Sequence, residues 1–152
     1  MAGIANSIAR AHRGEHPAVV ARLVSGWAVM SDRQYPRGWC VLMADPVVPT
    51  LNDLDEPSRL AFLSDVAALG DAVLAATGCR RINYAIYGNQ EPELHAHIIP
   101  RYADEPSDLI TKPIWLHPAE KLDGRPFDAE RDADLVAAIR DHLESKGRTL
   151  AK

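Results

Sequence analysis

The stretch from Glu93 to Ile99, Glu-Leu-His-Ala-His-Ile-Ile, constrains the fold more than any other part of the chain. Apolar and ionisable side chains alternate along it, and a period of two is typical of a β-strand with one buried face. The predicted core face consists of Leu94, Ala96 and Ile98. The predicted opposite face consists of Glu93, His95 and His97. Because three ionisable side chains are costly to bury, we expect that face to line an open site.

The neighbouring segments extend this strand into a sheet. Apolar runs bounded by Gly, Pro and Asp predict strands at 27–30, 39–43, 81–87 and 93–99, and a short edge strand at 114–116. Strands that follow one another after short turns favour antiparallel pairing. The fold class is therefore α+β: a mostly antiparallel five-stranded sheet with a long helix packed on it.

Helical signals stand on both sides of these strands. The long helix follows a capping Asp53 or Asp55, carries Pro57 in its first turn and stops at Gly78. Apolar residues at helical spacing predict a last amphipathic helix over 128–146. The same spacing over 19–24, after Pro17, predicts a helix that ends at Gly26, and 1–15 is predicted to be a mobile arm or a frayed helix.

The chain's 152 residues fit one domain, with a core at about 18–118 and a C-terminal helical extension at 119–152. A net charge of −4 does not favour a nucleic-acid partner, although one small anion needs only a local site. Cys40 and Cys79 have no partner spacing, so we expect free thiols of a reducing compartment. With no apolar leader and no long apolar run, the sequence predicts a cytoplasmic protein without membrane contact.

The two histidines of the predicted strand suit chemistry at phosphorus. A neutral imidazole is a competent nucleophile through Nε2 when its Nδ1–H is held by a fixed acceptor. A second imidazole two residues on can contact the phosphate or protonate the leaving oxygen. The competing interpretation is a zinc or iron site made by Glu93, His95 and His97, and spacing alone does not choose between the two.

The wider context resembles the histidine triad family. The stretch GNQEPELHAHIIPRY is similar to that family's signature, in which His, apolar, His, apolar, His and two apolar residues follow one another. Pro100-Arg101 follows it here, as in members that resemble the dinucleoside polyphosphate hydrolase branch. The resemblance runs from about residue 27 to residue 102 and includes a polar strand end at Asp32 and a glycine turn at Gly38.

This resemblance implies a HIT-like fold and a nucleotide hydrolase or nucleotidyl transferase. Its substrate would be a nucleoside phosphoanhydride or phosphoramidate, such as a dinucleoside polyphosphate, cleaved through a covalent nucleotidyl-histidine. His95 matches the family nucleophile, and His97 matches the histidine that contacts the scissile phosphate and leaving group. The implied substrate-binding residues are Asp32, Asn89, Gln90, Glu93 and Arg101. No cofactor or metal is required, a divalent cation can accompany the substrate, and a homodimer is expected.

Two positions depart from the family pattern. Glu93 replaces the first histidine of the motif but retains the backbone carbonyl that accepts the nucleophile's Nδ1–H in the family. Trp39 stands where many relatives carry another histidine, and we interpret it, like Trp115, as a core residue. These departures leave a third hypothesis open, a nucleotide-binding module without catalysis.

Overall fold

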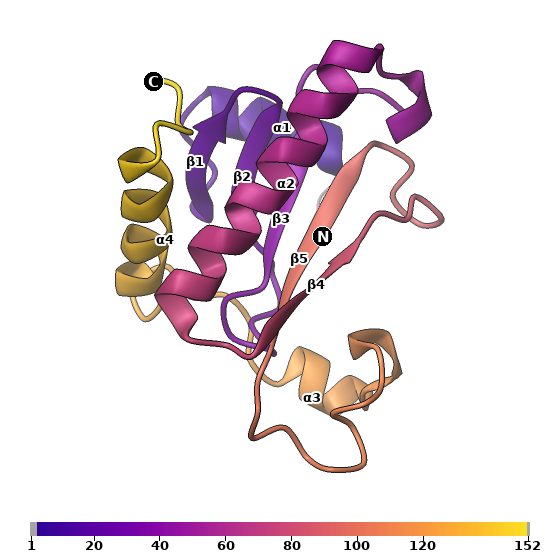
Figure 1. The fold of residues 1–152 in the computed structure, drawn as a ribbon, viewed down its shortest axis with the longest axis vertical. Coiled ribbons are helices and arrows are strands. Elements are labelled where there is room, and N and C mark those ends of the chain that lie inside the picture. The colour runs from indigo at the N-terminus through magenta and orange to yellow at the C-terminus, as the bar shows by residue number, and fades with distance from the viewer. Residues whose placement is uncertain (1–2, 152) are drawn as a thin grey trace.

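The computed structural model describes residues 3–151 and contains one five-stranded antiparallel sheet with the strand order β1-β2-β3-β5-β4 (Figure 1). The strands are β1 (Val19–Leu23), β2 (Gly26–Met30), β3 (Cys40–Ala44), β4 (Arg81–Ala85) and β5 (His95–Arg101). Every neighbouring pair is antiparallel. The predicted α+β class and five-stranded sheet are confirmed.

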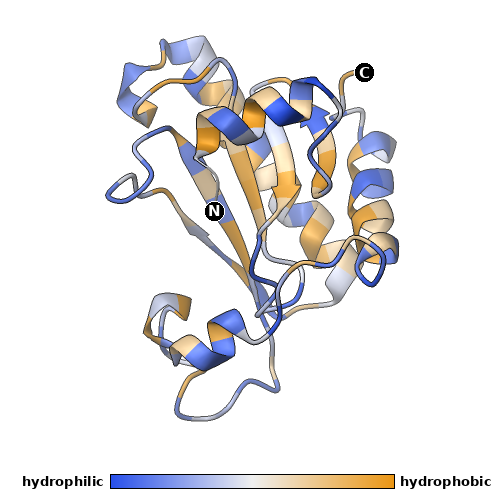
Figure 2. Ribbon diagram, turned by 180° about the vertical axis from the view of Figure 1, so that it is seen from behind, coloured by the Kyte–Doolittle hydropathy of each residue, from blue (hydrophilic) through white to orange (hydrophobic). Residues whose placement is uncertain are grey.

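Helices lie on both faces of this sheet. They are α1 (Ile4–His12), α2 (Glu56–Thr77), α3 (Ala119–Asp123) and α4 (Ala133–Ser145), with 3₁₀ turns η1 (Leu51–Asp53) and η2 (Ile114–Leu116). Figure 1 shows α2 and α4 in front of the sheet, and Figure 2, turned by 180°, shows α1 across the opposite face. The segment with η2 and α3 lies beyond the end of β5 in both views.

The long helix α2 follows its sequence signals. The Asp55 carboxylate accepts a hydrogen bond from the Ser58 N–H at 2.8 Å, and Gly78 ends the helix with φ of 65°, a conformation that glycine adopts without a steric penalty. By length and composition α2 is apolar enough to span a membrane. In this fold it is the central helix of the core, because Phe62, Leu69 and Val73 are fully buried against the sheet.

The main core lies between the sheet and the two helices α2 and α4. It includes Leu94, Ala96 and Ile98, which confirms the predicted core face of the histidine strand. It also includes Leu135, Ile139 and Leu143 of α4, so the C-terminal helix shares the core of the sheet. The helix begins at Ala133, later than predicted, because Asp132 is held in the preceding turn by Arg125 and Arg131.

The N-terminal segment is an ordered helix where a mobile arm or frayed helix was predicted. Ile4, Ile8 and Ala11 recur at helical spacing and are at most 5% exposed. They pack on the β2 and β3 residues that share the histidine face of the sheet: Trp27, Val29, Val41 and Met43. The predicted mobility is therefore wrong within the described residues, and α1 covers the β2 and β3 part of this sheet face.

Three further local predictions are wrong. Residues 19–24 do not form a helix, because Val20 and Leu23 are buried as part of β1, which pairs with β2. Residues 114–116 form the turn η2 and not an edge strand. Pro100 does not stop β5 but lies within it, at a point where β3 pairs only as far as Ile98 and β4 is the remaining neighbour. Cys40 and Cys79 are free and buried, as expected.

Candidate active site

The strand β5 presents His95 and His97 on the part of the sheet face that α1 leaves uncovered. Met43 and Val41 of β3 pair with these two histidines and continue the same face under α1. The imidazole rings lie 5.0 Å apart between centroids and are inclined by 77°. Each histidine is less than 9% exposed, so both rings sit in a hollow and not on an open surface.

A backbone carbonyl fixes the state of the His95 ring. Nδ1 of His95 lies 2.7 Å from the carbonyl oxygen of Glu93. A carbonyl oxygen only accepts, so Nδ1 carries a proton and donates it, and in the neutral ring Nε2 is then the nitrogen with the free lone pair. The Glu93 side chain does not line the cavity, so Glu93 takes part through its backbone.

Aromatic rings surround His97. The indole Nε1–H of Trp39 donates to Nδ1 of His97 at 3.2 Å, and the two rings meet edge to face. Trp115 contacts His97 at 5.1 Å between centroids and also meets Trp39 and Tyr87. Burial among these rings, together with the neighbouring His95, lowers the pKa of His97 to about 4. His97 is therefore neutral at physiological pH.

These side chains line a cavity of about 600 Å³, which is large enough for a nucleotide-sized ligand. Its lining consists of Ser31, Asp32, Arg33, Trp39, Tyr87, Gly88, Asn89, Gln90, Glu91, His95, His97 and Trp115. A second groove, of about 710 Å³, runs along β4 and the 110–115 segment and shares Tyr87 and Trp115 with the first. Only the first cavity contains the histidines, so it is the candidate active site.

Solved structures of histidine triad proteins share this architecture. One from Bradyrhizobium japonicum is 22% identical over 82% of this chain and 89% of its own, with a TM-score of 0.67. One from Sinorhizobium meliloti is 21% identical over 87% and 94%, with a TM-score of 0.68. A histidine triad nucleotide-binding protein from Sulfolobus tokodaii is 16% identical over 92% of each chain, with a TM-score of 0.70.

The chain has the histidine triad fold. No protein-family profile matches its sequence, and no curated protein does so either. The likeness is therefore one of structure at low identity, and the dinucleoside polyphosphate branch is not distinguished by it.

Within this fold, the cavity brings most of the predicted site residues together. The buried His95 and His97 line it from β5, and two loops complete it, here called its rims: the β2–β3 loop with Asp32 and the β4–β5 loop with Asn89 and Gln90. Among the lining residues that sequence reasoning did not assign to the site are Arg33, Tyr87, Glu91 and Trp115. Trp115 is 37% exposed and is a wall of the cavity, so its interpretation as a core residue is wrong.

Arg33 is the cation that the sequence reasoning overlooked. It lies on the rim next to Asp32, and its Nε is 2.8 Å from Oδ1 of Asp123 in α3. Both side chains of this ion pair are well exposed, so it is weak and exchangeable. The adjacency of Asp32 and Arg33 at a strand end was the available signal, since polar residues at such ends often line sites.

A buried glutamine holds the loop that carries Asp32, Arg33 and Trp39. The Gln34 amide donates to the carbonyls of Ser31 and Trp39, each at 2.9 Å, and accepts from the N–H of Gly38. Gly38 has φ of 94°, which requires a residue without a side chain.

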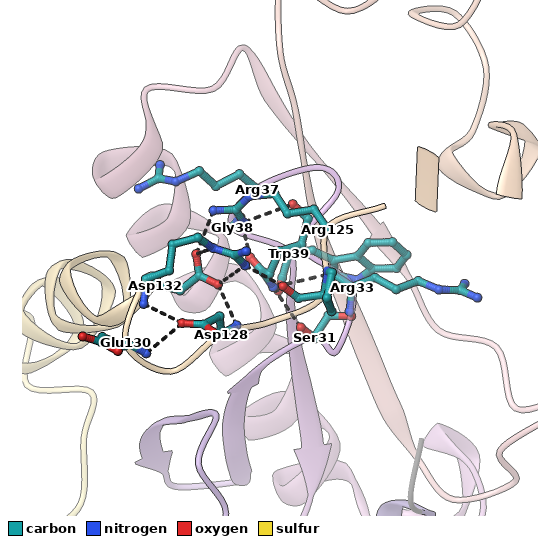
Figure 3. Close-up of polar contacts among 12 residues, drawn as sticks. Ser31, Arg33, Arg37, Gly38, Trp39, Arg125, Asp128, Glu130 and Asp132 are labelled. Carbon is teal, nitrogen blue, oxygen red and sulfur yellow. Dashed lines mark hydrogen bonds and ion pairs between the residues drawn. The ribbon is translucent and has the colours of Figure 1, made fainter. Parts of the chain in front are cut away.

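The C-terminal segment holds this loop from outside, as Figure 3 shows. The backbone N–H of Gln34 donates to the Arg125 carbonyl at 2.7 Å, and Arg125 pairs with the buried Asp132 at 2.8 Å. Arg131 also pairs with Asp132, and Phe127 donates its N–H to the Asp32 carbonyl. The 125–132 segment thereby fixes one rim of the cavity.

Arg101, the remaining predicted substrate ligand, lies away from the histidine cavity. Its guanidinium donates to both carboxylate oxygens of Glu105, to Oδ1 of Asn83 and to the carbonyls of Leu109 and Ile110. Its donors thus bind Asn83 of β4 and the segment after β5. Arg101 organises that segment, which leads to Trp115, and reaches the cavity only through it.

The geometry does not support the alternative metal site. Within residues 3–151, no three His, Cys, Asp or Glu side chains lie close enough together to hold a metal ion. The His95 and His97 rings lie next to each other, but the third proposed ligand, Glu93, is not among the residues that line the cavity.

Proposed function

We propose that this protein is a nucleotide hydrolase or nucleotidyl transferase in which His95 attacks the α-phosphorus of a nucleoside phosphoanhydride or phosphoramidate. One observation carries the proposal: the Glu93 carbonyl fixes the His95 proton on Nδ1, so that Nε2 enters the cavity as a nucleophile. The likeness to histidine triad proteins supports the choice of phosphorus chemistry.

The reaction has two displacements. A bond forms between Nε2 of His95 and phosphorus while the bond from phosphorus to the leaving group breaks. Water, or a second acceptor, then breaks the P–N bond and releases the nucleotide with its original stereochemistry after two inversions. His97 contacts the phosphate throughout, since its ring lies 5.0 Å from that of His95.

The rims supply groups for the rest of the substrate. Arg33 offers a full positive charge to phosphate oxygens, and Asn89 and Gln90 offer amide donors. Asp32 lines the same cavity and can accept from ribose hydroxyls, and the exposed parts of Tyr87 and Trp115 offer a surface for the base. The scheme needs no resident metal, and a divalent cation would arrive with the substrate's phosphates.

The test is intact-protein mass spectrometry after brief mixing with diadenosine tetraphosphate or an adenosine phosphoramidate. The wild type is expected to gain one nucleotidyl group and release product, whereas His95→Ala is expected to do neither. His142→Gln on α4, on the far side of the sheet, is the matched control and should react like the wild type. Turnover by His95→Ala equal to that of the wild type would refute the assignment of His95 as the nucleophile.

The departures at Glu93 and Trp39 favour one other candidate, a nucleotide-binding module without turnover. Calorimetric binding of a nucleotide with no adduct and no product would select it over the enzyme.

We also retain the homodimer and the cytoplasmic location as predictions. Exposed Leu60 and Leu63 on α2 and Tyr84 on the edge strand β4 offer apolar area for a second copy, and sedimentation velocity measures the oligomeric state.

A further inference from the structure

The contact between Trp39 and His97 determines where the His97 proton lies. Trp39 is 1% exposed, just before β3, and its Nε1 lies 3.2 Å from Nδ1 of His97. An indole nitrogen donates and has no lone pair to accept with. Nδ1 of His97 must therefore accept, and a neutral ring then carries its proton on Nε2.

The surroundings of His97 also keep the ring neutral. The rings in contact with it are those of His95 from its own strand, Trp39 from just before β3 and Trp115 from η2. Protonation would add a hydrogen at Nδ1, directly against the indole N–H. The charged side chains that line the same cavity, Asp32, Arg33 and Glu91, stand on its two rims.

We propose that Trp39 is a positioning residue that holds His97 as a neutral hydrogen-bond donor, and that this site is consequently specific for leaving groups that depart as anions. The substrate class is then the nucleoside phosphoanhydrides and not the phosphoramidates. The leaving-group specificity rests on the proposed function. The role of Trp39 in setting the His97 tautomer does not depend on it.

The chemistry follows from the proton count. When His95 attacks an anhydride, the bridging P–O bond breaks and its electron pair stays on the departing phosphate, which is stable as an anion. The neutral Nε2–H of His97 stabilises that charge by a hydrogen bond, as a neutral imidazole does elsewhere. A departing amine needs a whole proton, and His97 could give one only by becoming a strongly basic imidazolate.

The ring state is tested directly by ¹⁵N NMR of the histidine rings. In the wild type, His97 is expected to show the Nε2–H tautomer at every pH from 5 to 8 and not to titrate. In Trp39→Phe the ring should become a mixture of tautomers and should titrate at a higher pH. Trp115→Phe removes another indole from the same cavity and should leave the tautomer unchanged.

A wild-type His97 that carries its proton on Nδ1, or that titrates near pH 6.5, would overturn the role of Trp39. This measurement needs no variant, so it decides even if Trp39→Phe does not fold. Trp39→His restores an N–H donor at the same position and is expected to recover part of the wild-type tautomer signal.

The leaving-group specificity is tested by comparing kcat/KM for diadenosine tetraphosphate with kcat/KM for an adenosine phosphoramidate at pH 7.5. The anhydride is expected to be favoured by about 100-fold or more, the usual value of a general acid that the amine would lack here. Equal rates would overturn the leaving-group assignment. Turnover of neither substrate would refute the proposed function and this assignment together, while the NMR result would still decide the role of Trp39.

Discussion

Arg101 and Glu105 form a bidentate ion pair at the end of β5, with Nε of Arg101 2.9 Å from Oε1 of Glu105 and Nη2 of Arg101 2.7 Å from Oε2 of Glu105. Both side chains are 8% exposed. Burial by itself would raise the pKa of Glu105, but the hydrogen bonds from Arg101 and Tyr102 outweigh it and hold that pKa below its usual range. The pair anchors the segment that carries Trp115 to the cavity.

Arg101→Met is expected to lower the free energy of unfolding by about 3–5 kcal/mol, because it leaves the Glu105 carboxylate buried without its partner. Urea denaturation measures this loss. Arg80→Met, an exposed neighbour, should change it by less than about 0.5 kcal/mol. A fully stable Arg101→Met with a raised KM would instead restore the substrate-binding role predicted from sequence.

Gln34→Leu should damage stability and substrate binding together. The change removes the hydrogen bonds that the Gln34 amide makes with the Ser31 and Trp39 carbonyls and with the Gly38 N–H inside a fully buried site, at a cost of about 2–3 kcal/mol. The loop would no longer hold Arg33 and Trp39 in place, so nucleotide affinity should fall as well. Unfolding and calorimetric titration measure the two effects, and an unchanged affinity would contradict the role given to this loop.

The pKa of His97 makes stability depend on pH. Because the folded ring binds its proton more weakly than the unfolded one, the unfolded state takes up more protons between the two pKa values. Stability is therefore complete above about pH 6.5 and is lost as the pH falls toward 4, by roughly 3 kcal/mol in total for the shift from 6.5 to about 4.

Unfolding free energies measured from pH 8 to pH 4 test this dependence. His97→Gln should flatten the curve. A part of the slope should remain, since burial also lowers the pKa of His16. Identical curves for the wild type and His97→Gln would show that the His97 pKa is not depressed in the folded protein.

Arg33→Gln should weaken substrate binding by about 10- to 100-fold, the value of one or two hydrogen bonds between charged groups. Steady-state KM and its dependence on salt measure the effect. Asp123→Asn provides the counterpart, because it releases Arg33 from its ion pair and should leave KM unchanged or lower. A raised KM in Asp123→Asn alone would mean that the ion pair, and not the free guanidinium, serves the site.

Much of the fold follows from local patterns in the sequence. The strands around 27–30 and 39–43 and the helix that starts after Asp55 were predictable because their apolar residues and caps act over a few residues. Residues 19–24 illustrate the limit. A short apolar run fits a helix and a strand equally well, and here the pairing with β2 makes it a strand.

The site divides in the same way. His95, His97 and the Glu93 carbonyl lie within five residues, so their relation was visible in the sequence. The contact from Trp39 to His97 spans 58 residues and depends on how β3 pairs with β5. Arg101 was misplaced for a similar reason, because three of its partners, Glu105, Leu109 and Ile110, lie in a segment without regular structure.

The strand β5 has a consequence for how this protein can change over time. His95 and His97 face the cavity, while the alternating Ala96 and Ile98 are fully buried in the core that includes α2. A larger side chain at Ala96 would shift the backbone that carries both histidines. A substitution in β5 that changes core packing is therefore expected to change the reactivity of the histidines as well. New specificities are therefore expected to arise on the two rims, where Arg33 and Asn89 can vary without disturbing the sheet.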